Sequence, residues 1–123
     1  MSINRPDTRD LVEAVREFLE TRVMPAVDEH AAFHTRVAAN VLAIVERELD
    51  LGPDLDAEER ERLRHLLGKE GTLSELNREL CLQIREGALD YHDPALVEHL
   101  YKTTLGRMSI DNPRYSAYRK ATF

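Results

Sequence analysis

The chain has 123 residues and a formal net charge of −6, and a third of its residues are charged. This length fits one core, and we expect a single helical domain over 1–123. The acidic balance argues against nonspecific nucleic-acid binding, which requires clustered positive charge. The single cysteine excludes an internal disulfide. Because no signal peptide and no membrane-spanning apolar run of roughly 20 residues is visible, a cytoplasmic protein without membrane contact is expected.

Apolar periodicity and helix-stop signals predict an all-α fold with five helices. An N-terminal arm over 1–7 precedes the first helix, which is expected from Thr8 to Val23 with Pro25 as its stop. The second helix is expected from about Glu29 to Leu51, where Gly52 and Pro53 should end it. It is the longest predicted element and should form the centre of the helical bundle.

The other three helices are expected to begin at side-chain caps, two of them capping boxes, and the first two to end at glycine. Their expected bounds are Asp56–Gly68, Thr72–Gly87 and Asp93 to about Met108. A C-terminal tail over 111–123 is expected to be irregular. Because every connection is short, consecutive helices should be antiparallel neighbours.

A polar row lies at one edge of the apolar arc of the second helix. Arg36, Asn40 and Arg47 fall within about 40° of each other when successive residues are placed 100° apart, beside Phe33. Two guanidinium groups and an amide are suited to bind a carboxylate, a phosphate or the polar rim of a partner. The alternative is that the arginines are solvated surface residues and that Asn40 makes one hydrogen bond between helices.

Three ionisable side chains interrupt the apolar faces of the first two helices: Arg22, His34 and Glu48. Burial of a charge is costly unless the charge is paired, so these residues should find partners or lie near helix ends. For Glu48, the expected partner is Arg5 or Arg9.

His30 and His34 are four residues apart on one helix face, a spacing that can place two imidazoles on a metal ion. The glutamate of the zinc-protease helix motif is absent, since Ala31 follows His30. A metal site in a bundle would need further ligands from other helices. The two histidines are therefore weak metal candidates, and no metal is predicted.

No motif for catalysis or for a cofactor is visible. The chain has no glycine-rich phosphate loop, no nucleophile elbow and no arrangement of serine, histidine and aspartate that can be nominated as catalytic. Cys81 is expected to be a small core or boundary residue rather than a nucleophile. We therefore predict no catalytic residue and no cofactor.

The predicted C-terminal tail is a second candidate binding segment. Asn112 and Pro113 form a turn signal, and Tyr115 begins a stretch with two tyrosines and several basic residues. Tyrosine and arginine are enriched at the energetic centres of protein interfaces. The tail could equally fold back onto its own bundle, and the two readings are compatible.

With these residues described, the chain resembles a family of small bacterial proteins known only as a domain of unknown function. The resemblance covers nearly the whole chain and is most specific in the second helix. It is carried by Arg5–Pro6, 11–19, 33–40, 44–49, Leu66–Gly68, Leu76–Asn77 and Asn112–Tyr115. Such proteins are encoded beside aminoglycoside-phosphotransferase-like kinases and acyl-CoA dehydrogenase-like enzymes. The resemblance implies an accessory subunit of a kinase that acts on hydroxyacyl-CoA.

The leading hypothesis is a non-catalytic accessory protein that supports a kinase-like partner. The resemblance favours six residues for contact with that partner: Arg36, Asn40, Arg47, Asn112, Pro113 and Tyr115. A second hypothesis is a bundle that binds a small anion or CoA thioester through Arg36, Arg47 and the basic tail. A third is a metal-dependent bundle enzyme that uses His30 and His34, and a DNA-binding helix-turn-helix is the weakest. The wide apolar arc also allows a homodimer.

Overall fold

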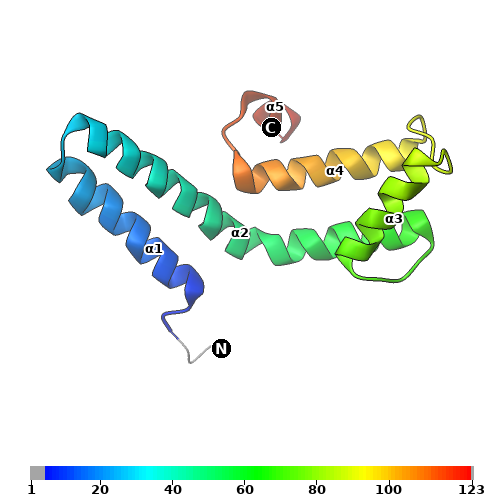
Figure 1. Cartoon of the computed structure of the whole chain (residues 1–123), viewed down its shortest axis with the longest axis horizontal. Coiled ribbons are helices and arrows are strands. Elements are labelled where there is room, and N and C mark those ends of the chain that lie inside the picture. The colour runs from blue at the N-terminus through cyan, green and yellow to red at the C-terminus, as the bar shows by residue number, and fades with distance from the viewer. Residues whose placement is uncertain (1–4, 123) are drawn as a thin grey trace. The chain divides into compact units, whose positions relative to one another are not determined.

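The computed structural model describes residues 5–122, and the side chains of 5–121. Within this range every regular element is helical, which confirms the all-α class, the five helices and the long second helix. Residues 1–4 of the expected N-terminal arm lie outside the described range. The helices are α1 (Thr8–Phe18), α2 (Glu29–Leu67), α3 (Leu73–Arg85), α4 (Pro94–Asp111) and α5 (Ser116–Thr122), as Figure 1 shows.

The chain divides into two compact units, 1–51 and 52–123. The first unit is a helical hairpin formed by α1 and the N-terminal half of α2, joined by a π-helical turn over Leu19–Val23 and a 3₁₀ turn over Met24–Ala26. The second unit holds the rest of α2 with α3, α4 and α5. Because α2 belongs to both units, this division leaves the expected single domain over 1–123 a prediction.

Most of the predicted helix ends are confirmed. Thr72 and Glu75 form the expected capping box at the start of α3, and Asp93 caps α4 with Pro94 at its first position. The structure adds a capping box between Asp7 and Asp10 at the start of α1. After α2, Gly68 has a φ of +64°, a left-handed conformation that favours glycine and ends the helix.

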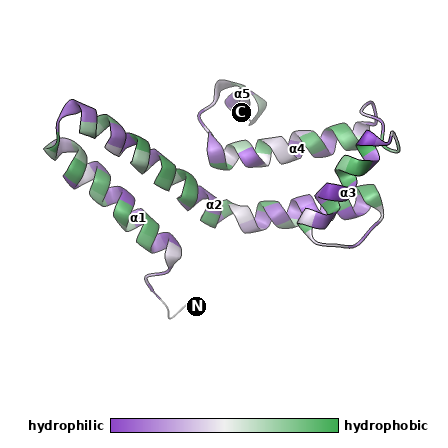
Figure 2. Cartoon of the chain, viewed as in Figure 1, coloured by the Kyte–Doolittle hydropathy of each residue, from purple (hydrophilic) through white to green (hydrophobic). Residues whose placement is uncertain are grey.

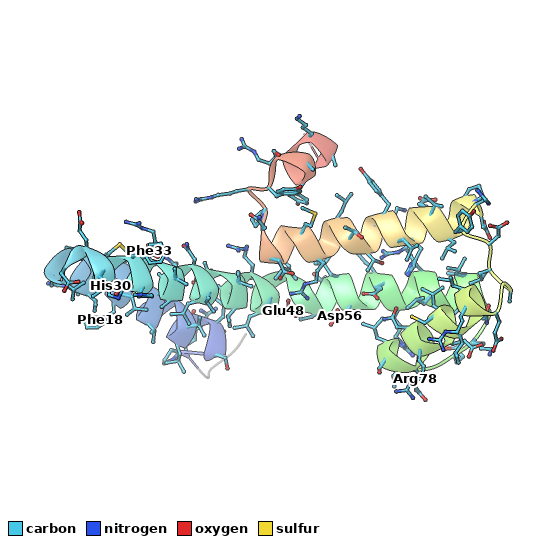
Figure 3. The ribbon with its side chains drawn as sticks, turned by 45° about the horizontal axis from the view of Figure 1, so that its top comes forward. Phe18, His30, Phe33, Glu48, Asp56 and Arg78 are labelled. Carbon is cyan, nitrogen blue, oxygen red and sulfur yellow. The ribbon has the colours of Figure 1, made fainter. Side chains whose placement is uncertain are left out.

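The predicted break between the second and third helices is wrong. α2 runs without interruption from Glu29 to Leu67, with Pro53 inside it and Gly52 buried. Asp56 therefore lies within the helix rather than at an N-cap, and Figure 3 labels it on the continuous ribbon. A proline inside a helix costs about 3 kcal/mol through its missing N–H and its clash with a carbonyl. Burial of Leu63 and the strong helix formers after Pro53 offset that cost.

The predicted irregular tail over 111–123 is also wrong for its described residues. Asp111 is the last residue of α4, and α5 follows over Ser116–Thr122. Asn112 interrupts the two helices with a φ of −157° and a ψ of 72°, because the residue before a proline is disfavoured in helical conformation. The carbonyl of Tyr115 then accepts a hydrogen bond from the Arg119 N–H and starts α5.

The second unit contains the hydrophobic core. Leu63 of α2, Leu76 and Leu80 of α3 and Leu96 of α4 are buried against each other. Each of the three helices thus contributes one buried side, which fixes their packing as a small bundle. Leu63 and Leu96 have no exposed surface at all.

The first unit buries much less. Of the residues described in 1–51, only Ala39 and Glu46 are buried, and α1 has no buried residue. Figure 2 shows apolar and polar residues along both helices of the hairpin. Many of its large apolar side chains are consequently exposed, and this feature defines the first candidate site.

Candidate functional site

A row of exposed apolar side chains follows the N-terminal half of α2 at intervals of four residues. Phe33, Val37 and Val41 are 57%, 45% and 52% exposed, and Val45 extends the row at 37%. An interval of four residues turns only about 40° around a helix, so the row crosses one face as a shallow diagonal. We call these four residues the α2 apolar row.

The predicted polar residues lie at the edge of this row. Arg36 and Asn40 are exposed, and in the part of the chain that the structure describes neither has a hydrogen-bond or ion-pair partner. Ala39 is buried and marks the side of α2 that packs on α1. Arg36 and Asn40 lie about 60° and 100° from that side, and Phe33 lies about 120° from it. Arg47 shares this edge, but it is half-buried and already engaged in an interaction.

The outer stripe of α1 adds further apolar surface to the hairpin. Leu11, Val15 and Phe18 are 55%, 51% and 57% exposed and are spaced four and three residues apart, as on one helical face. Figure 3 places Phe18 and Phe33 near the end of the hairpin where α1 leads into α2. Exposed apolar surface on this scale is typical of an interaction site rather than of a free surface.

An ion-pair network holds α1 against α2. Glu46 is buried and accepts hydrogen bonds from Arg16, while Arg9 lies 3.6 Å from Glu46 and 3.3 Å from Asp50. The hydrogen bonds to Glu46 and to Glu20 raise the pKa of Arg16. Glu46 and Asp50 thus meet Arg9 across the hairpin, and the expected pairing of Glu48 with Arg5 or Arg9 stays a prediction.

A signal for this network is present in the sequence. Glu46 and Asp50 are one helical turn apart on the side of α2 that carries Ala39, while Arg9 and Arg16 are two turns apart on α1. The network was not predicted, because the predicted site residues were chosen beside the apolar arc on the opposite side of α2. Arg22 and His34 were expected to have partners or to lie near helix ends. Both are exposed to solvent, so neither needs a partner to compensate for burial.

The two histidines proposed as metal ligands are near each other but exposed. The ring centroids of His30 and His34 are 4.6 Å apart in an edge-to-face arrangement, and His34 also contacts Phe33. Among the described residues, no group of three or more potential metal ligands is formed by histidine, cysteine, aspartate or glutamate. Both rings are exposed at the surface of the hairpin.

Cys81 does not occupy a core or boundary position, because the structure leaves it exposed. The buried side of α3 is defined by Leu76 and Leu80, one turn apart. Cys81 follows Leu80 and is rotated by about 100° from it, which turns it toward solvent.

The predicted tail residues form the connection between α4 and α5. The Tyr115 N–H donates to the Asn112 carbonyl at 3.1 Å, so these residues make a tight turn around Pro113. α5 contacts α4, the helix that precedes it. Tyr115 nevertheless remains 50% exposed. On α4, Val97, Leu100 and Tyr101 are also exposed at helical spacing.

A second polar cluster, which was not predicted from the sequence, lies between α2 and α4. His99 is buried, and its Nδ1 accepts a hydrogen bond from Arg62 Nε at 3.2 Å. Arg62 Nη2 also donates to Thr103 Oγ1 at 3.0 Å. Burial, followed by the nearby charge of Arg62, lowers the pKa of His99, so the ring is neutral at pH 7. The spacing of His99 and Thr103, one turn apart on α4, is the signal that could have indicated a shared face.

A hollow of about 400 Å³ opens beside this cluster and is lined by residues of α2 and α4. Its polar lining residues are Arg62, His65, Glu98, His99 and Lys102. A hollow of this volume is within the range of small-molecule sites.

Comparison with known proteins identifies the family but no function. Among the described residues, no helix has the length and apolar character to cross a membrane. No curated protein and no solved structure matches the chain. A family model described as a domain of unknown function, DUF6285, matches residues 25–115, which includes all of α2, α3 and α4. The chain belongs to the DUF6285 family.

Proposed function

We propose that this protein is a non-catalytic interaction protein that binds another protein through the α2 apolar row and its Arg36–Asn40 edge. The observation that carries the proposal is the exposure of Phe33, Val37 and Val41 on a hairpin that buries almost nothing of its own. The four side chains of the row present roughly 300 Å² of apolar surface, estimated from half-exposed side chains of typical size. A standard interface uses about 800 Å² per partner, so this surface can supply its apolar centre.

The chemistry of the edge indicates what kind of partner fits. Arg36 offers a guanidinium group and Asn40 an amide, and neither is engaged by the described residues. The fitting partner is an apolar protein surface bordered by carboxylates, which Arg36 can bind in a bidentate manner. A second copy of this chain fits less well. An antiparallel pairing centred on Val41 would bring Arg36 of one copy near Arg47 of the other.

The identity of the partner rests on the resemblance alone. We propose an aminoglycoside-phosphotransferase-like kinase encoded beside this protein, with hydroxyacyl-CoA as the substrate class of that kinase. In this proposal the protein acts in the bacterial cytoplasm as an accessory subunit. The exposed turn at Asn112, Pro113 and Tyr115 would supply further contacts, and Arg47 would extend the polar edge.

The test is co-expression with such a neighbouring kinase, followed by co-purification and measurement of the dissociation constant. Val41→Asp places a charge in the apolar row and Arg36→Glu reverses the charge of its edge. Each should weaken binding at least tenfold, since a buried unpaired charge or a like-charge contact costs more than 1.4 kcal/mol. Arg78→Glu is the matched control, because Arg78 is exposed on α3 in the other unit.

Three outcomes would reject the proposal. One is a kinase whose solubility and activity are the same with and without this protein. Another is equal binding by the wild type, Val41→Asp and Arg36→Glu, with circular dichroism showing that all are folded. The third is a wild-type dimer that Val41→Asp converts to a monomer without any loss of kinase binding, because a second copy would then occupy the row.

A further inference from the structure

Arg62 is a half-buried cation that forms no ion pair with any residue in 5–121. Arg9, Arg16 and Arg64 are also half-buried, and each of them binds one or more carboxylates. Arg62 instead donates to the ring of His99 and to the hydroxyl of Thr103. Among the described residues no carboxylate lies within ion-pair distance of it. Removal of a guanidinium group from water without a counter-charge is unfavourable, so this position favours an added anion.

The surrounding groups offset this charge only in part. The His99 ring is buried and neutral, and Thr103 carries no charge. Glu59 accepts from Asn77 at 3.0 Å, and Glu98 pairs with Lys102 at 2.8 Å. The pKa of Glu98 is lowered mainly by the hydrogen bond from Lys102 and to a smaller extent by the charge of Arg62.

The hollow of about 400 Å³ gives an anion access to Arg62. Besides Arg62, its lining includes His65, His99 and Lys102 as nitrogen groups, against Glu98 as a single carboxylate. Because His99 Nδ1 accepts from Arg62, the neutral ring carries its proton on Nε2 and remains a donor there. The lining is therefore rich in donors and poor in acceptors.

A second hollow of about 260 Å³ is also lined by Arg62 and Lys102, together with Arg107 and three acidic residues, Asp56, Glu58 and Glu59. Its three carboxylates offset its three cations, whereas the larger hollow has two cations and one carboxylate. The larger hollow is therefore the better site for an anion.

We propose that the larger hollow between α2 and α4 binds a small molecule through phosphate or carboxylate oxygens held by Arg62. Lys102 and the ring of His99 provide further donors around the bound oxygens. This site uses no residue of the α2 apolar row and does not depend on protein binding. It also differs from the anion site that the sequence suggested at Arg36 and Arg47.

The wild-type protein can report on this site through its own histidines. Inorganic phosphate, titrated at constant ionic strength, should shift the ring signals of His99 and His65 in ¹H–¹³C spectra in a saturable manner. His30, His34 and His92 do not line the hollow and serve as internal controls. A parallel titration with acetate shows whether the hollow prefers phosphate or carboxylate oxygens. A phosphate site responds more strongly to phosphate, and a carboxylate site responds more strongly to acetate.

Arg62→Gln should reduce the affinity for the responding anion at least tenfold. Arg60→Gln is the matched control, because Arg60 is exposed on the same helix and donates to the Gly71 carbonyl. Lys102→Gln gives a second, exposed variant with a smaller expected loss, in case Arg62→Gln does not fold. The proposal is overturned if neither anion shifts His99, if both Arg62→Gln and Lys102→Gln bind like the wild type, or if His30 and His34 respond in place of His99.

Discussion

Glu46 shows how much one residue contributes to the hairpin. Its side chain is 6% exposed and it is shared by Arg16 and Arg9 across α1 and α2. Substitution Glu46→Ala leaves Arg16 with Glu20 and Arg9 with Asp50, and it removes the bond between Arg16 and Glu46 across the hairpin. We expect a loss of about 1–3 kcal/mol in the free energy of unfolding, less than for a fully buried pair because Arg16 is partly solvated.

Urea denaturation followed by circular dichroism measures this loss. Glu17→Ala is the control, since Glu17 is an exposed acid on α1, the other helix of the hairpin, and should change the stability by less than about 0.5 kcal/mol. Equal effects of the two substitutions would mean that the network does not hold α1 on α2.

The carboxylates of the two capping boxes make the stability depend on pH. Hydrogen bonds from the Thr72 backbone lower the pKa of Glu75 below its ordinary value of 4.5, and those from the Asp7 backbone lower the pKa of Asp10 below 3.8. A carboxyl group whose pKa is lower in the folded state stabilises the fold above its unfolded pKa. This stabilisation is lost as the pH falls through the folded pKa.

Glu75→Gln isolates this effect, because glutamine keeps the hydrogen bond of the box but does not ionise. The variant should be close to the wild type at pH 7 and should lose less stability between pH 5 and pH 3. Urea denaturation at each pH checks the slope, with Glu17→Gln as the control. A variant slope as steep as that of the wild type would place the acid sensitivity in other groups.

At the scale of single elements, Pro53 is the residue that most opposes its helix. Since α2 is continuous around it, Pro53→Ala should restore one backbone hydrogen bond and raise the free energy of unfolding by about 1–3 kcal/mol. Pro94→Ala is the control, because a proline at the first position of α4 fits the helix and its replacement should change little. The interpretation fails if Pro53→Ala is no more stable than the wild type in urea.

The same contrast explains which elements could be predicted. Thr72 with Glu75, and Asp93 with Pro94, specify helix starts through local hydrogen bonds and a fixed φ, and both were correct. Gly52 and Pro53 were misread as a stop because their local cost is outweighed by packing that involves Leu63 and distant residues of α3 and α4. α5 was missed because a helix of seven residues with weak apolar periodicity leaves little signal in the sequence.

The candidate sites follow a similar rule. Arg36 and Asn40 were found because they share one helix face, which the sequence period displays directly. Arg62 and His99 come from helices whose sequence positions are 37 residues apart, and only the fold brings them together. Contact of these partner-binding residues with a kinase stays a prediction.

At the scale of the whole molecule, the two units should differ in local stability. The second unit contains the leucine core, whereas the first buries only Ala39 and Glu46 among its described residues. Regions with few buried apolar contacts open at lower free energy. Amides of α1 should therefore exchange with solvent faster than those of α3 in native-state hydrogen exchange, and binding of a partner to the α2 apolar row should slow exchange in the hairpin.

Leu96→Ala separates the two units in the same experiment. Deletion of this fully buried side chain should cost about 2–5 kcal/mol and accelerate exchange around Leu63 and Leu76. In α1 the exchange rate should remain close to that of the wild type, because its opening does not require the leucine core to open. If Leu96→Ala accelerates α1 as strongly as α3, the hairpin and the core open as one cooperative unit. In that case the continuous helix α2 would couple the hairpin to the leucine core, and the hairpin would need no partner to stay folded.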